Sequence, residues 1–102
     1  MNKLLLVLAA LSLLPSAAMA KSIANPPTAA QLDAFYAACI HVAPDASVLC
    51  KCKEAAAPKI IDTDFMGVVI ASIKGKPLEA KYYDAYNNYI ARSNQICKPQ
   101  YM

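Results

Sequence analysis

Four stretches of the chain repeat apolar residues with the spacing of an amphipathic helix. The first follows Thr28-Ala29-Ala30-Gln31, which matches a capping box because the Thr hydroxyl and the Gln side chain can satisfy free backbone N–H groups. We expect this helix to end before Pro44. Its predicted apolar face consists of Leu32, Phe35, Tyr36, Cys39 and Val42.

The second predicted helix carries two cysteines one residue apart. Asp45 or Ser47 can cap its start, and Pro58 should end or kink it because proline lacks a backbone N–H. Cys50 and Cys52 are separated by about 200° around a helix, so each is expected to bond a different neighbouring helix. The predicted apolar side consists of Val48, Leu49, Cys52, Ala55 and Ala56.

The third and fourth predicted helices supply most of the remaining apolar residues. The third starts at the capping sequence Asp62-Thr63-Asp64 and ends at Lys74-Gly75. It is apolar on most of its circumference and is therefore the expected central core helix, although the β-branched residues of Val68-Val69-Ile70 leave a strand as the alternative. The fourth, the longest, is predicted from about Pro77 to Ile96, with Cys97 at its end.

Together these patterns predict an all-α fold, a small four-helix bundle. The sequence contains no internal repeat, and its two glycines disfavour a turn-rich β fold. Residues 21–102 are expected to form a single small helical domain.

Residues 1–20 have the layout of a secretory signal peptide. A short basic start, Met1-Asn2-Lys3, precedes an apolar run from Leu4 to Leu14, and Ala18-Met19-Ala20 provides the small residues of a cleavage site. The apolar run is shorter than the roughly 18 residues that a membrane-spanning helix needs. We therefore expect cleavage after Ala20 and a protein that does not span the membrane, located in a bacterial periplasm or secreted.

All four cysteines lie in the predicted mature chain, and an even number in an exported protein indicates two disulfides. A Cys50–Cys52 bond would close a very small, strained ring. In both other pairings the second helix is the hub, and we favour Cys39 with Cys50 and Cys52 with Cys97. Such cross-links suit a domain of this size, because its hydrophobic burial alone is marginal.

Metal binding or thiol exchange is an alternative use of the same cysteines. Cys39-Ile40-His41 and Cys50-Lys51-Cys52 present soft ligands on either side of one turn, suited to zinc or copper(I). However, ligands two positions apart on a helix diverge, and an oxidising compartment consumes exposed thiols. The sequence therefore predicts no metal and no cofactor.

No set of residues in the sequence has the pattern of a catalytic site. The only histidine, His41, has no oriented partner, and no serine lies in a nucleophile-elbow sequence. Asp62 and Asp64 are better explained by helix capping than by paired-carboxylate chemistry, since their side chains diverge. We predict that the protein is not an enzyme.

A tyrosine cluster near the fourth helix is the strongest candidate for a binding surface. Four of the six tyrosines fall between residues 82 and 89, and at least one must be exposed because neighbouring positions on a helix differ by about 100°. Core filling is the simpler interpretation of the cluster, and a partner-binding face is the functional one. The predicted partner-binding residues are Tyr82, Tyr83, Tyr86, Lys74 and Lys76.

The charge balance gives no reason to expect a nucleic-acid partner. Without Lys3, nine Lys and Arg residues oppose seven Asp and Glu residues. The leading hypothesis is a non-enzymatic periplasmic or secreted binding or inhibitory protein, whose partner is another envelope or secreted protein. The alternatives are an envelope structural or chaperone-like component and a thiol or metal protein.

The sequence carries no family motif. In format alone, meaning a signal peptide, about eighty mature residues, several helices and two disulfides, it resembles small periplasmic immunity proteins that block cell-wall-degrading toxins. It is also similar in size to periplasmic acid-stress chaperones. No functional residue carries over from either group.

Overall fold

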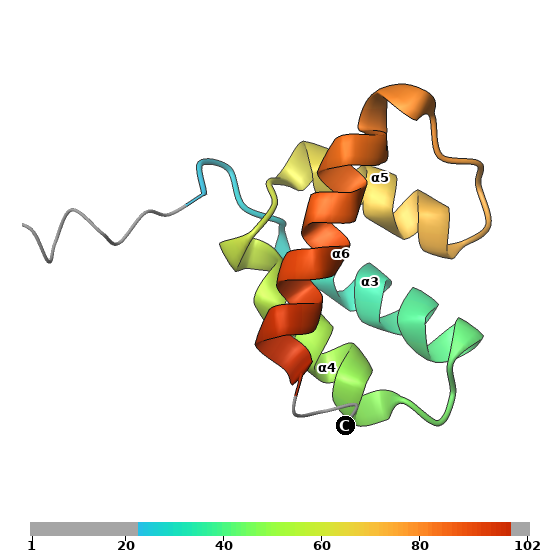
Figure 1. Cartoon of the computed structure of the whole chain (residues 1–102). Helices are drawn as coiled ribbons and strands as arrows, with labels where there is room; N and C mark the ends of the chain where they lie inside the picture. The colour runs from blue at the N-terminus through green and yellow to red at the C-terminus, as the bar shows by residue number, and fades with distance from the viewer. Residues whose placement is uncertain (1–22, 99–102) are drawn as a thin grey trace, which may run out of the picture.

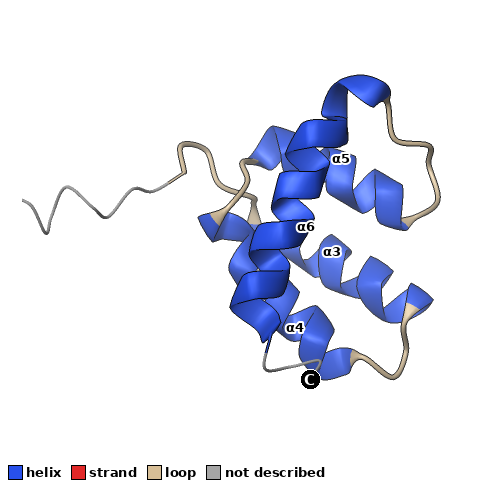
Figure 2. Ribbon diagram, viewed as in Figure 1, coloured by secondary structure: helices blue, strands red, loops and turns tan. Residues whose placement is uncertain are grey.

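The computed structural model describes residues 23–98, so the predicted signal peptide lies outside the described residues. The four α-helices are α3 (Ala29–Val42), α4 (Ser47–Ala56), α5 (Thr63–Ile73) and α6 (Tyr83–Cys97), with 3-10 turns at Ala57–Lys59 (η1) and Ala80–Tyr82 (η2). The described part contains no strand (Figures 1 and 2), so the all-α four-helix prediction is confirmed and the strand alternative for α5 is wrong. No helix in it is long and apolar enough to cross a membrane.

The start of α3 is fixed by the predicted capping box. The backbone N–H of Gln31 donates to Thr28 Oγ1, and the backbone N–H of Thr28 donates to Gln31 Oε1, both at 3.1 Å. Gln31 also donates from Nε2 to the Thr63 carbonyl at 2.9 Å and accepts from the Thr63 hydroxyl at 2.8 Å. One side chain therefore caps α3 and ties its first turn to that of α5.

The start of α4 differs from the prediction. Its N-cap is Ala46, with no side-chain capping bond, so neither Asp45 nor Ser47 has the expected role. The connection instead closes through its backbone, where the Ala46 N–H donates to the Ala43 carbonyl at 3.0 Å, and Ser47 is already the first helical residue. At the other end α4 gives way to η1 at Pro58, as the missing N–H predicts.

Both ends of α5 follow the sequence signals. Asp62 caps it by accepting from the Phe65 N–H at 2.9 Å. At its C-terminus Gly75 has a φ of 97°, a conformation that glycine adopts without strain. The N–H groups of Gly75 and Lys76 then donate to Ser72 and Ala71, both at 3.0 Å, in a Schellman motif.

The prediction that helix formation resumes at Pro77 is wrong. Residues 76–79 form an extended connection, and α6 begins only at Tyr83 after η2. The connection has to return along α5, because the Tyr82 ring meets Phe65 of the first turn of α5 edge-on at 5.9 Å between centroids. Extended chain covers roughly 3.3 Å per residue and a helix only about 1.5 Å, so a helix from Pro77 would fall short.

The core runs through the interior of all four helices. Met66, Val69 and Cys97 are essentially inaccessible to solvent. The predicted apolar faces are less complete than expected at the α3–α4 turn, where Val42 is 59% and Val48 63% exposed. The buried cluster consists of Phe35, Ala56, Ala57, Ile60, Ile61, Met66, Val69, Tyr89 and Cys97.

The disulfide pairing favoured from the sequence is confirmed. Cys39 bonds Cys50 and Cys52 bonds Cys97, with Cα–Cα separations of 5.8 and 5.9 Å. α4 is therefore joined to α3 on one side and to the end of α6 on the other. α5 is less exposed than α4, since only Asp64 and Gly67 are exposed along its length, in agreement with its predicted place in the core.

Candidate functional site

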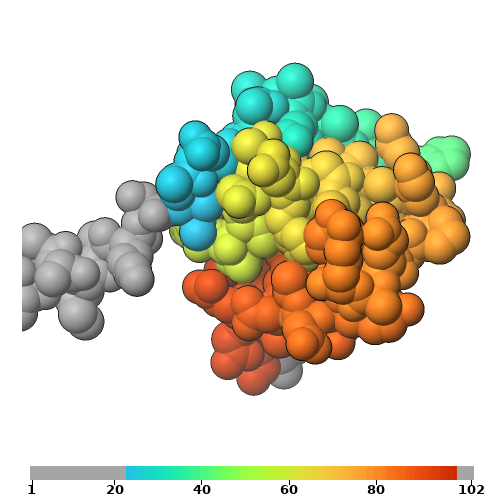
Figure 3. Space-filling view, turned by 90° about the horizontal axis from the view of Figure 1, so that it is seen from above, coloured from blue at the N-terminus to red at the C-terminus, as the bar shows by residue number. Residues whose placement is uncertain are grey.

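One side of α5 forms a wall of a surface cleft of about 290 Å³. The returning connection forms the other wall, and in Figure 3 this orange segment lies against the yellow surface of α5. From α5 come Asp64, Gly67, Val68, Ala71 and Ser72, and from the connection come residues 76–79 and Tyr82.

The cleft exists because α5 carries small side chains on this face. Residues 64, 67, 68, 71 and 72 recur at helical spacing, so they share one side of the helix. Gly67 is exposed, and a Cβ placed there would meet no atom within 4 Å. Gly67, Ala71 and Ser72 are too small to fill the space under the connection, so the cleft stays open on this one side of a helix that is otherwise largely covered.

The structure brings only some of the predicted partner-binding residues to the cleft. Lys76 and Tyr82 line it directly. Tyr86 is half-buried behind it, and its hydroxyl accepts from Ser72 Oγ at 3.4 Å. Tyr83 is 52% exposed, as the sequence requires of at least one cluster member, but it does not line the cleft.

Lys74 belongs to a different surface. It lies at the rim of a groove of about 490 Å³ between the C-terminal ends of α3 and α5, with His41, Val42 and Ile73. Tyr89, the remaining member of the cluster, is 2% exposed and fills the core, which bears out the simpler interpretation for that residue. The five predicted residues therefore do not all line one cleft.

Both signs of charge border the cleft. Asp64 and Glu79 contribute carboxylates, and Lys76 contributes an ammonium group. Lys81 lies over the Tyr82 ring at 5.1 Å and pairs with Glu79 at 3.8 Å. These side chains are well exposed, so the pair adds little stability and remains available to a partner.

The α5 wall of the cleft was not predicted from the sequence. Gly67 within an otherwise apolar helix was the one available signal, since a glycine inside a helix costs stability unless it has another role. The opposite wall of the cleft depends on the path of the connection after α5, and the sequence did not predict that path.

All four cysteines are in disulfides, and none of the described cysteines is free. In this state Cys39 and Cys50 are bonded to each other and Cys52 is bonded to Cys97, so no thiolate of the metal alternative is available as a ligand. Within residues 23–98 no three His, Cys, Asp or Glu side chains are grouped as a metal site. A zinc or copper(I) role would require reduction of the bundle's cross-links.

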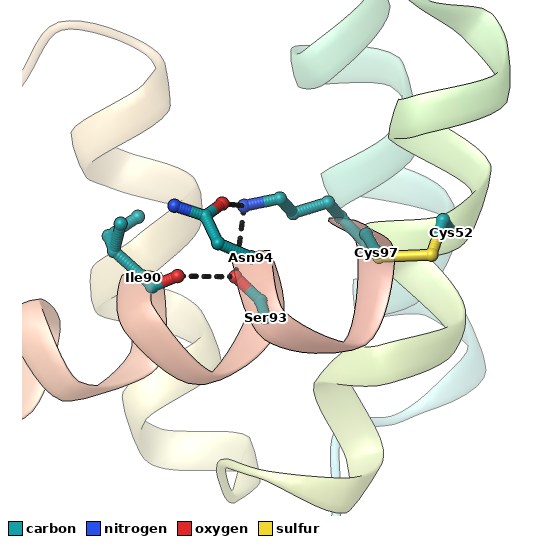
Figure 4. Close-up of a disulfide and its surroundings, with 6 residues drawn as sticks. Cys52, Ile90, Ser93, Asn94 and Cys97 are labelled. Atoms are coloured by element: carbon teal, nitrogen blue, oxygen red, sulfur yellow. Dashed lines mark hydrogen bonds between the residues drawn. A yellow bond between two sulfur atoms is a disulfide. The ribbon is translucent and has the colours of Figure 1, made fainter. Parts of the chain in front are cut away.

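A second polar site lies beside the Cys52–Cys97 bond (Figure 4). The half-buried Lys53 Nζ donates to Ser93 Oγ at 2.9 Å and to Asn94 Oδ1. Ser93, which is fully buried, donates in turn to the Ile90 carbonyl at 3.2 Å. Burial lowers the pKa of Lys53, because the charged form is the one that loses hydration.

Comparison of the chain with protein-family models, curated proteins and solved structures found no match. The site is therefore interpreted from its geometry alone. Its walls offer an aromatic ring, small residues and charges of both signs.

Proposed function

We propose that this protein is a non-enzymatic exported binding protein of inhibitory, immunity-like type, and that its α5 cleft receives a segment of another envelope or secreted protein. The observation that carries the proposal is the cleft itself, where a low floor of small residues faces the aromatic wall of Tyr82. Tyrosine is enriched at protein interfaces because it supplies a large contact area together with a polar tip.

The cleft lies open at the surface, so it can receive side chains that project from another protein. At about 290 Å³ this cleft suits one or two anchoring side chains, and the exposed Tyr83 lies one residue beyond its wall. Lys76 and Glu79 can then pair with charges at the edge of such a segment.

The cross-links support a binding role. α4 is bonded to two helices, so little of the scaffold needs to become ordered when a partner binds. Two disulfides are also typical of proteins of an oxidising compartment, which agrees with export through the predicted signal peptide. The partner would then be met outside the cytoplasm.

The test is affinity capture with the oxidised protein, residues 21–102, from an envelope extract, with proteins quantified by mass spectrometry. Gly67→Trp should fill the cleft, because the space above Gly67 is open. Ala55→Trp adds the same side chain at an exposed position of α4 and is the matched control. Tyr83→Ala tests the adjoining aromatic contact.

We expect one protein to be captured by the wild type and by Ala55→Trp, to be lost with Gly67→Trp, and to be reduced with Tyr83→Ala. The purified pair should then form a complex of fixed stoichiometry in a calorimetric titration. Capture of that protein by a folded Gly67→Trp variant would contradict the proposal. Weak capture of many proteins that strengthens in acid would instead support the chaperone-like alternative.

A further inference from the structure

A smaller cavity, of about 170 Å³, lies where all four helices meet and opens to the surface. Its walls are almost wholly apolar and include Phe35 of α3, Leu49 of α4, Val69 of α5 and Ile90 of α6. Lys53 is the only charged side chain among the residues that line it. It shares no lining residue with the α5 cleft.

The Lys53 ammonium group has hydrogen-bond partners but no counter-charge among the described residues. Both of its partners, Ser93 and Asn94, are neutral. The ion pairs formed by the described lysines are Lys51 with Glu54 and Lys81 with Glu79. An ammonium group carries three donors, so the two bonds to α6 leave one for a further acceptor.

An unpaired ammonium group in a half-buried position costs free energy unless an anion accompanies it. The lowered pKa of Lys53 has burial as its cause, which agrees with a cation that lacks a nearby carboxylate. An apolar cavity with one cation at its wall is complementary to a molecule that has an apolar body and one negative group.

We propose that this cavity binds a small apolar monocarboxylate, with its carboxylate paired to Lys53 Nζ and its hydrocarbon body among Phe35, Val69 and Ile90. The volume sets the size of the body, since an apolar cavity of about 150 Å³ accepts a benzene-sized ligand. A hydrogen bond between two charged groups is about twice as strong as a neutral one, so the carboxylate provides selectivity as well as affinity.

The experiment is an NMR titration of the oxidised protein, residues 21–102, with hexanoate, hexanamide and hexylammonium as probes. Hexanoate should shift the resonances of Val69, Ile73 and Ile90 in a saturable manner. Hexanamide should bind at least tenfold more weakly, and hexylammonium more weakly still, because the cation repels Lys53.

Three variants test the role of Lys53. Lys53→Met should bring hexanoate affinity to within about twofold of hexanamide affinity. Lys51→Met removes the same charge from an exposed position on the same helix and should leave hexanoate affinity within about twofold of the wild type. Leu49→Phe keeps Lys53 but narrows the cavity, and should weaken all three probes at least tenfold.

Several results would overturn the proposal. These are a lack of saturable shifts with hexanoate, equal affinity for hexanoate and hexanamide in the wild type, or unchanged hexanoate affinity in a folded Leu49→Phe variant. Binding to phosphatidylglycerol vesicles without binding of free hexanoate would also do so, since it would assign Lys53 to a lipid surface. If Lys53→Met does not fold, Leu49→Phe and the probe series still decide the outcome.

Discussion

Residues 39–56 and residues 62–82 are held in the bundle by different means. The first region contains three of the four bonded cysteines, so α4 is fixed covalently to α3 and to α6. The second region contains α5 and the returning connection, has no cysteine of its own, and is held by buried side chains, a helix cap and a Schellman motif. The residues that line the proposed binding cleft all lie in the second region.

Two covalent bonds constrain the first region, whereas the connection of the second region is held by non-covalent contacts such as that between Phe65 and Tyr82. Non-covalent contacts in the second region should therefore decide the shape of the cleft, and the covalent bonds should decide whether the bundle holds together.

Removing the disulfide that closes the longer loop should lower the unfolding free energy most. The Cys52–Cys97 bond joins residues 45 apart and closes a loop that contains the whole second region, whereas Cys39–Cys50 joins residues 11 apart. From loop entropy we expect the double variant Cys52→Ala/Cys97→Ala to lose about 4 kcal/mol of unfolding free energy, and Cys39→Ala/Cys50→Ala about 3 kcal/mol. Urea titration of both gives the comparison, and a larger loss from the shorter bond would contradict it.

Truncating a buried side chain of α5 should cause the next largest loss of unfolding free energy. Met66 is fully buried, so Met66→Ala should lower the unfolding free energy by about 2–5 kcal/mol through lost burial and the cavity left behind. Val68→Ala is the control on the same helix, because Val68 is only half-buried and faces the cleft. Equal losses in the two variants would show that the cleft wall is packed as tightly as the core.

Loss of the α5 cap should have a smaller effect. Asp62→Ala removes the acceptor for the Phe65 N–H and should cost about 1 kcal/mol. Asp64→Ala removes a carboxylate from the same turn, where it is exposed and makes no capping bond, and should cost only a few tenths of a kcal/mol through the helix dipole. Amide exchange at Phe65 should accelerate in the first variant alone, and similar exchange in both would rule out the assigned cap.

The smallest expected effect on stability comes from Tyr89 and is present only in alkaline solution. Burial, and secondarily the neighbouring Tyr86, raises the pKa of Tyr89 above its ordinary value of 10.0. Above pH 10 the unfolded chain therefore loses this proton while the folded chain keeps it, so the folded state loses stability as the pH rises. Tyr89→Phe should show a shallower decline than the wild type between pH 10 and pH 11, and parallel declines would contradict this assignment.

The comparison also explains which features could be predicted from the sequence. The capping box at Thr28, the Asp62 cap and the Gly75 terminus depend on residues close together in the chain, and all three are confirmed. The pairing of Cys50 and Cys52 with different helices followed from their angle on one helix.

The features that were missed depend on distant packing. The extended path of residues 76–79 is required by the Phe65–Tyr82 contact, which no local pattern encodes. The cleft beside α5 and the cavity at Lys53 likewise depend on how distant segments pack together. The tyrosine cluster predicted at least one exposed tyrosine, which is Tyr83, but could not show that Tyr89 turns inward and that Lys74 lines another groove.

The spacing of one residue between Cys50 and Cys52 has a consequence for oxidative maturation. Bonds that leave opposite sides of a helix prevent it from turning about its axis, so the native isomer can form only when α4 has docked in its final orientation. Exchanging the partners of the two cysteines would require α4 to rotate by nearly half a turn, and inserting one residue between them would shift one sulfur by about 100°. The spacing between these two cysteines in the sequence therefore fixes the rotation of α4 about its own axis.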